Sequence, residues 1–163
     1  MVRGAAEGAV RPDWPDIWME MARLVARRSL CVRAQCGCVI VTANNQVVAT
    51  GYNGPPKNFE HGGLPCTEWC DRPRTGGGPA GYDDCVTSHA EMNALVTGDR
   101  TRYEGGTMYC TRVPCFTCAK VIANSGIKWV YYLTDRPEDM DREPDKSITF
   151  LRRCGVVCIP VSS

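Results

Sequence analysis

Strands and helices alternate through the second half of the chain, and this alternation limits the fold more than any other feature. The segment 106–111 (GTMYCT) has the composition of a strand, and 115–125 (CFTCAKVIANS) has that of a helix that ends at Gly126. Three further elements alternate in the same way: a strand at 128–133, a helix at 147–154 and a strand at 155–161. Because parallel strands need crossover connections, the pattern predicts an α/β layered fold with a partly parallel sheet.

The first half of the chain predicts a helix followed by a β-hairpin. Residues 13–29 (DWPDIWMEMARLVARRS) begin with acidic residues and an early proline, end with two arginines, and are therefore typical of a helix. Their apolar residues at helical spacing are Ile17, Met21, Leu24 and Val25. The apolar segments 36–42 and 46–52 flank the polar turn ANN and predict the hairpin, and a further helix is expected at 88–97.

Length and charge limit the classes of partner. A chain of 163 residues predicts one domain, here 13–163, preceded by a flexible arm at 1–12. The formal net charge is +1 and the basic residues are scattered, so no basic stripe for a polynucleotide is expected, whereas a small anionic substrate stays possible. The N-terminus has no apolar stretch of signal-peptide length and no segment is long enough to cross a membrane, so we expect a cytoplasmic protein.

Eleven cysteines are too many for disulfides in a reducing compartment, and an odd number cannot all pair within one chain. Clustered cysteines in such a chain more often bind metal or act in catalysis, while isolated ones pack as small hydrophobic residues. The second group is expected to contain Cys36, Cys38, Cys110, Cys154 and Cys158.

Two predicted helix starts carry residues that are suited to bind a metal. Cys115 and Cys118 are spaced C-x-x-C where a strand passes into a helix, so one turn of backbone can aim both sulfurs at one point. Taken alone, this spacing also fits a redox dithiol, a structural zinc half-site or chance. His89 stands at the other helix start, where a polar residue is common in any case. Since successive crossover helices of a parallel sheet start at the same edge, the three side chains can meet there.

Three protein ligands would leave one position of a tetrahedral zinc for water, which is the arrangement of a catalytic site. Glu91 lies two residues after His89, outside the ligand shell, and can move the protons that water gives up and a leaving group gains. The order His89-Ala90-Glu91, then Pro114-Cys115-Phe116-Thr117-Cys118, matches the H-x-E…P-C-x-x-C pattern of zinc-dependent nucleobase deaminases.

Together with longer matching segments, these motifs resemble the deoxycytidylate (dCMP) deaminase family within the cytidine deaminase-like fold. The similar segments are RRSLCVRAQCGCVIV (27–41), GYNGPPKNF (51–59), HAEMNAL (89–95) and GGTMYCTRVPCFTCAKVIANSGIKWVYY (105–132). The resemblance, over residues 14–160, implies a three-layer α/β/α fold with a five-stranded mixed sheet and hydrolysis of dCMP to dUMP and ammonia. It also implies a homo-oligomer, a dimer or a hexamer, with dCTP and dTTP as possible effectors.

The resemblance implies roles for the motif residues. His89, Cys115 and Cys118 would hold the catalytic zinc, and Glu91 would move a proton from water to N3 of the base and then to the departing ammonia. The backbone amides of Ala90 and Cys115 would lie beside the attacking oxygen.

Substrate-binding residues are expected in the flanking loops. Asn53 matches the asparagine that contacts the sugar in related deaminases, although YNGP is also a good turn on chemistry alone. Arg33, Lys57 and Arg112 could bind a 5′-phosphate, with Arg33 the first choice, and solvated surface side chains are the alternative for each.

A second, structural zinc is also implied by the resemblance. The Gly-, Pro- and Cys-rich segment 53–87 is too long for an idle connection and suggests a functional or metal-tied loop. The expected ligands are Cys31, Cys66, Cys70 and Cys85, with His61 as a substitute for one cysteine. Free thiols are the alternative.

Other functions stay open from sequence alone. The substrate could be CMP, a modified cytosine nucleotide, a riboflavin-pathway pyrimidine, single-stranded nucleic acid or tRNA adenosine, although near-neutral charge disfavours the polynucleotides. A non-catalytic zinc module is the alternative of another class, and Glu91 with a three-ligand shell argues against it.

Overall fold

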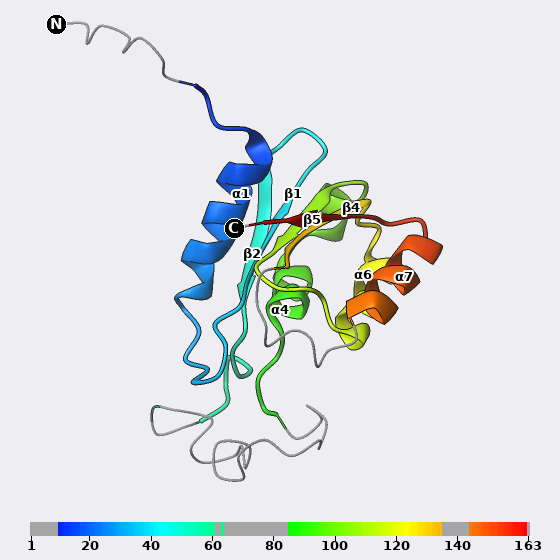
Figure 1. The fold of residues 1–163 in the computed structure, drawn as a ribbon. Helices are drawn as coiled ribbons and strands as arrows, with labels where there is room; N and C mark the ends of the chain where they lie inside the picture. The colour runs from blue at the N-terminus through cyan, green and yellow to red at the C-terminus, as the bar shows by residue number, and fades with distance from the viewer. Residues whose placement is uncertain (1–9, 61–62, 64–84, 135–143, 163) are drawn as a thin grey trace, which may run out of the picture.

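A computed structural model describes residues 10–60, 63, 85–134 and 144–162 and contains a five-stranded sheet in the order β2-β1-β3-β4-β5 (Figure 1). The strands are β1 (Gly37–Val41), β2 (Val47–Tyr52), β3 (Thr107–Cys110), β4 (Trp129–Leu133) and β5 (Val157–Val161). β1 runs antiparallel to both β2 and β3, while β3, β4 and β5 are parallel. The predicted hairpin and mixed sheet are therefore confirmed.

Helices cover both faces of this sheet, as Figure 1 shows. They are α1 (Trp14–Ala26), α4 (Ala90–Thr97), α5 (Arg100–Tyr103), α6 (Phe116–Ser125) and α7 (Pro144–Arg153). Alternate side chains of β1 point to opposite faces of the sheet. Val39 and Val41 pack in a cluster with α1, and Ile40 packs in the larger cluster with α4, α6 and α7. The expected three-layer α/β/α arrangement is confirmed.

Two glycines of the hairpin let the helices approach the sheet closely. A Cβ at Gly37 would lie 2.0 Å from the carbonyl oxygen of Ala22 in α1, and one at Gly51 would lie 2.1 Å from that of Ala90 in α4. Any side chain at either glycine would push the facing helix away. Gly51 thus fixes the depth at which α4 lies on β2.

The predicted first helix is confirmed as α1, and its apolar residues differ in burial. Ile17 and Met21 are half-buried and pack against the core, whereas Leu24 is 61% exposed; the buried residues of α1 are Trp18, Met19, Ala22 and Ala26. The close approach at Gly37 favours the small side chains at Ala22 and Ala26, where the helix backbone meets the strand.

Most predicted boundaries of helices and strands agree with the structure within a few residues, but α7 starts at Pro144 and α5 was not predicted.

Cys38, Cys110 and Cys158 are buried, as expected of small hydrophobic residues, and half-buried Cys36 packs against the same core. Cys154 is exposed, so that prediction is wrong. It lies in the turn after α7, beside Gly155 at φ 81°.

The predicted division into an arm and one domain stays a prediction. Residues 10–12 are exposed, and the rest of the proposed arm lies outside the described residues. Within the ranges that the structure describes, no helix combines the length and the apolar character needed to cross a bilayer.

Candidate active site

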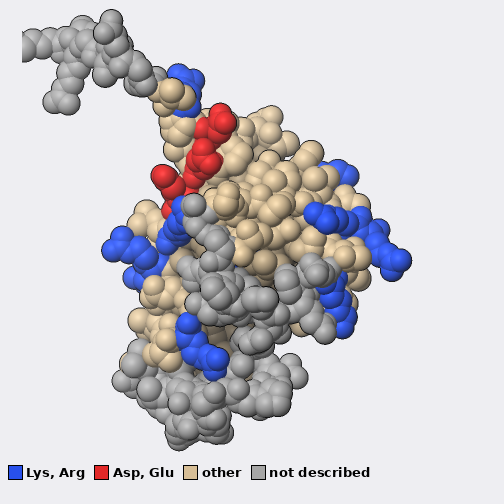
Figure 2. Space-filling model, viewed as in Figure 1, with Lys and Arg blue, Asp and Glu red and all other residues tan. Residues whose placement is uncertain are grey.

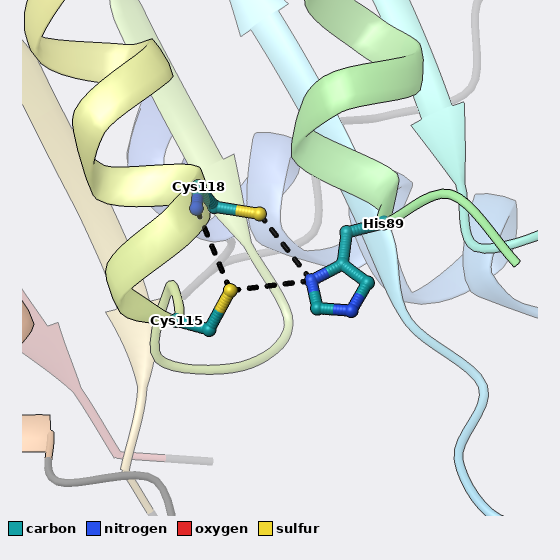
Figure 3. Close-up of side chains that lie close together, drawn as sticks. All are labelled: His89, Cys115 and Cys118. Carbon is teal, nitrogen blue, oxygen red and sulfur yellow. Dashed lines mark hydrogen bonds between the residues drawn. The ribbon is translucent and has the colours of Figure 1, made fainter. Parts of the chain in front are cut away.

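The imidazole of His89 and the sulfurs of Cys115 and Cys118 converge between the first turns of α4 and α6 (Figure 3). Nδ1 of His89 lies 3.4 Å from Sγ of Cys115 and 3.3 Å from Sγ of Cys118. All three ligand atoms lie within 4.8 Å of one another.

Strand direction brings these side chains together. β2 and β3 both run antiparallel to β1, so they point the same way and their carboxyl ends lie at the same edge. α4 follows β2 and α6 follows β3, on the same side of the sheet. The two helix starts therefore meet at that edge, as the sequence predicted.

Both helices begin with a ligand residue. His89 is the N-cap of α4, and Cys115 is the N-cap of α6, where its sulfur accepts a hydrogen bond from the backbone amide of Cys118 at 3.5 Å. Helix N-termini stabilise negative charge, so the start of α6 favours a thiolate at Cys115.

The donor set fits a zinc ion. Zinc ligands at about 2.3 Å for sulfur and about 2.0 Å for nitrogen, arranged tetrahedrally, are separated from one another by about 3.6 Å. The nitrogen–sulfur distances of 3.3 and 3.4 Å are close to this value. Among the described residues, no fourth histidine, cysteine or carboxylate joins the group of His89, Cys115 and Cys118. A three-ligand site leaves a position for a reacting molecule.

The pKa values of the two thiols shift in opposite directions. A hydrogen bond from Cys118, with smaller contributions from His89, outweighs burial and lowers the pKa of Cys115 to about 3. The hydrogen bond to Cys115, burial and the nearby Glu91 carboxylate raise the pKa of Cys118. Cys118 therefore needs a cation in contact to lose its proton, as a coordinating thiol does on binding metal.

Glu91 lies in the first turn of α4 and is only 7% exposed. Hydrogen bonds and burial raise the pKa of the Cys118 and Cys110 thiols, and the nearby charge of Glu91 adds a smaller contribution in the same direction. A buried carboxylate beside a metal-ligand cluster is suited to carry protons.

Asn53, which is also buried, already has backbone partners. Its Oδ1 accepts from the amide of Cys36 at 2.7 Å, and its Nδ2 donates to the carbonyl of Ala34 at 2.9 Å. These bonds hold the segment before β1 against the loop after β2. The predicted sugar contact would use the remaining hydrogen-bonding capacity of the amide.

The three candidate phosphate ligands are placed differently. Arg33 and Lys57 are exposed. Arg33 directly precedes Ala34, which accepts a hydrogen bond from Asn53, and Lys57 lies in the loop that follows Asn53. Arg112, between β3 and α6, is only 5% exposed. Arg112 precedes Cys115 by three residues along the chain. Ala90, the remaining substrate-binding candidate, begins α4 and is buried.

Two hydrogen-bonded connections near the cluster were not predicted from the sequence. Asn93 donates from its side-chain amide to the carbonyl of Tyr52 at 2.8 Å, which ties α4 to the end of β2. Gly54 and Ser88 exchange backbone hydrogen bonds of 3.1 and 2.9 Å, next to Asn53 and His89. No residue pattern indicates either connection, because each uses backbone groups of the loops as partners.

The second-zinc prediction cannot be followed through the structure. Cys66, Cys70 and His61 lie outside the described residues, and Cys31 and Cys85 are half-buried. A second structural zinc therefore stays a prediction.

Comparisons with known proteins agree with this geometry. The family described as the cytidine and deoxycytidylate deaminase zinc-binding region matches residues 12–134. The deoxycytidylate deaminase of Schizosaccharomyces pombe is 42% identical over 128 residues, which are 76% of this chain and 38% of that protein. The deoxycytidylate deaminase of Mycobacterium phage D29 is 41% identical over 128 residues, 75% of this chain and 95% of the phage protein. This chain thus spans well under half of the yeast relative and nearly all of the phage relative.

A solved structure shares the fold. The dCMP deaminase of cyanophage S-TIM5, in complex with dCMP and dUMP, superposes with a TM-score of 0.66 at 28% identity. The match covers 94% of this chain and 100% of the cyanophage chain. The expected cytidine deaminase-like fold is confirmed.

Proposed function

Because the chain belongs to the cytidine and deoxycytidylate deaminase family, a family of hydrolytic enzymes, we propose that it converts dCMP and water to dUMP and ammonia. The observation that carries the proposal is the buried Glu91 beside a three-ligand cluster of His89, Cys115 and Cys118. The names of the relatives, and the dCMP and dUMP bound to the cyanophage enzyme, support a deoxycytidine monophosphate as substrate.

His89, Cys115 and Cys118 would hold a zinc ion. When bound, zinc supplies a Lewis acid that makes water a nucleophile near neutral pH. The backbone amides of Ala90 and Cys115, at the two helix starts, would donate toward the oxygen that adds to the base, since amides in the first turn have no partner within the helix.

Glu91 would carry the protons. As water adds to C4 of cytosine, the carboxylate takes a proton from the water and gives it to N3. It then passes the second proton to the amino nitrogen, so that the C4–N bond breaks and ammonia leaves. Burial keeps bulk water away from this carboxylate, so its proton transfers go to the base.

The nucleotide would be held by the loops that surround the cluster. The Asn53 amide, fixed by Ala34 and Cys36, would contact the sugar, and Arg33, Lys57 or Arg112 would bind the 5′-phosphate. A homo-oligomer, dCTP and dTTP as effectors, a cytoplasmic location and a second structural zinc belong to the same proposal.

The test measures ammonia release from dCMP, CMP, cytidine and dCTP, with bound zinc determined for each protein. We expect the wild type to prefer dCMP, and Glu91→Ala to lose activity by about 10²–10⁴-fold while zinc stays bound. Turnover that survives Glu91→Ala with full zinc would exclude Glu91 as the proton carrier. No release from any of the four would reject a cytosine nucleotide as substrate.

A further inference from the structure

A hollow of about 430 Å³ lies on the side of the sheet that α1 covers, between the start of α1, the turn of the hairpin and the beginnings of β3 and β4. This volume is in the range of small-molecule sites. Its lining includes Asp13, Trp14, Asn45, Tyr109, Trp129 and Tyr131. The hollow is distinct from the metal cluster, which lies at the carboxyl ends of β2 and β3, on the side that α4 and α6 cover.

Aromatic rings form most of the lining. Tyr109 and Tyr131 are register partners on β3 and β4, and their ring centroids stack 4.9 Å apart. Trp129 lies two residues before Tyr131, so it points to the same side of the sheet, and it is 40% exposed. Trp14 is 53% exposed and stacks on buried Trp18 at 5.1 Å within α1. Two solvent-accessible indoles and a stacked pair of phenols therefore surround the hollow.

The hydroxyl of Tyr109 is a buried polar group that the fold leaves unused. Tyr109 is 3% exposed, and within the described ranges no hydrogen bond joins its hydroxyl to another residue. Burial, with a smaller contribution from Tyr131, raises the pKa of Tyr109 to about 12, so the phenol is neutral near pH 7 and its oxygen can accept a hydrogen bond. Because a buried hydroxyl without a partner costs stability, a ligand that donates to this oxygen is favoured.

The charge beside the hollow is negative. Of the described residues that line it, Asp13 is the charged one, and Asp16 and Glu20 are exposed further along α1. Figure 2 shows acidic side chains gathered over the start of α1. Asn45, on the hairpin turn, is held in place because its Oδ1 accepts a hydrogen bond from Nε1 of Trp18 at 3.3 Å. A carboxylate and the faces of aromatic rings attract cations, so this lining disfavours a nucleotide.

We propose that the hollow is a binding site for a small guanidinium compound. A guanidinium is planar and stacks on aromatic faces, so it would lie against the indole of Trp129 or Trp14. Its N–H groups point in several directions at once, so they would donate both to the Tyr109 oxygen and to the Asp13 carboxylate. One ligand thus uses the three features of the lining: the rings, the unpaired hydroxyl and the negative charge.

Isothermal titration calorimetry of the zinc-loaded protein with butylguanidinium, at about 0.15 M salt, tests the proposal. We expect saturable binding at one site per chain. Two probes separate the interactions, because butylurea has nearly the same shape and keeps N–H groups but has no charge, whereas tetramethylammonium has the charge but no N–H group. Each should bind about tenfold more weakly than butylguanidinium, since each lacks one of the two interactions.

Tyr109→Phe removes only the hydroxyl. It should weaken butylguanidinium binding about tenfold and leave the affinity for tetramethylammonium unchanged, because tetramethylammonium cannot donate to an oxygen. The midpoint of thermal unfolding should not fall, since the hydroxyl has no partner to lose among the described residues. Trp129→Leu should weaken the binding of both cations about fivefold, because it removes an aromatic face.

Asp13→Asn should weaken the binding of both cations about threefold. Glu20→Gln is the matched control: it removes the same charge from an exposed residue of α1 that does not line the hollow, and it should keep the wild-type affinity. Three results would each overturn the proposal: no saturable binding of butylguanidinium, equal affinity for butylurea, or unchanged butylguanidinium binding in Tyr109→Phe. The readout is heat of binding, so it is independent of the deaminase assay.

Discussion

The side-chain amide of Asn93 joins the helix that carries His89 to the strand that leads into Asn53. Its Nδ2 donates to the carbonyl of Tyr52 at 2.8 Å, and neighbouring Gly54 and Ser88 are paired through their backbones. Two loops that would contact the nucleotide are thereby held at a fixed distance from the zinc ligands. We assign Asn93 a positioning role, because it acts through Tyr52 and the loop that follows.

Asn93→Asp tests this role, because an ionised carboxylate has the shape of the amide but cannot donate to the Tyr52 carbonyl. We expect a loss of about 1–3 kcal/mol in the free energy of unfolding and a raised KM for dCMP, with zinc still bound. Thr97→Val is the control, since it removes a hydroxyl hydrogen bond to the Asn93 carbonyl within the same helix and should leave KM unchanged. A wild-type KM in Asn93→Asp would contradict the positioning role.

At the scale of single residues, the metal ligands can be predicted from the sequence more readily than the residues that position them. His89, Cys115 and Cys118 could be predicted to meet because metal ligands need specific atoms at helix starts that share a sheet edge. Asn93 could not be assigned, because its partner is a backbone carbonyl and a carbonyl leaves no mark in a sequence.

On each side of the sheet, one glycine of the hairpin lets a helix pack closely against the strands. Gly51 determines the position of α4, which carries His89 and Glu91, and Gly37 determines that of α1 on the opposite side. Helical periodicity predicted α1, but it did not indicate which residues lie closest to the sheet. The close approach at Gly37 places Ala22 and Ala26 there, whereas Leu24 is exposed.

The two glycines therefore give a matched pair of substitutions. Gly51→Ala and Gly37→Ala should each lower the free energy of unfolding by about 1–3 kcal/mol, because the new Cβ forces a helix outward. We expect Gly51→Ala to weaken zinc binding as well, since it displaces the helix that begins at His89, while Gly37→Ala should keep wild-type zinc affinity. Urea unfolding and competition with a zinc chelator measure both quantities. Equal zinc affinity in the two variants would show that the depth of α4 does not control the cluster.

At the scale of the whole molecule, the candidate site lies on one side of the sheet. The cluster and the loops around it lie at the carboxyl ends of β2 and β3, on the side that α4 and α6 cover, whereas α1 packs on the opposite side. The alternation of strands and helices was enough to predict the layers and the active edge. It could not reveal that Trp129 and Val157 are exposed, because the near-continuous apolar residues of β4 and β5 are typical of strands that are buried on both faces.

Anomalous X-ray scattering from crystals of the zinc-loaded protein, recorded on both sides of the zinc edge, tests the central claim most directly. The account predicts a zinc peak about 2.0–2.1 Å from Nδ1 of His89 and about 2.3 Å from Sγ of both Cys115 and Cys118, with no fourth protein side chain bound. A map without a zinc peak between these three atoms, or with a fourth side chain bound to it, would contradict the account.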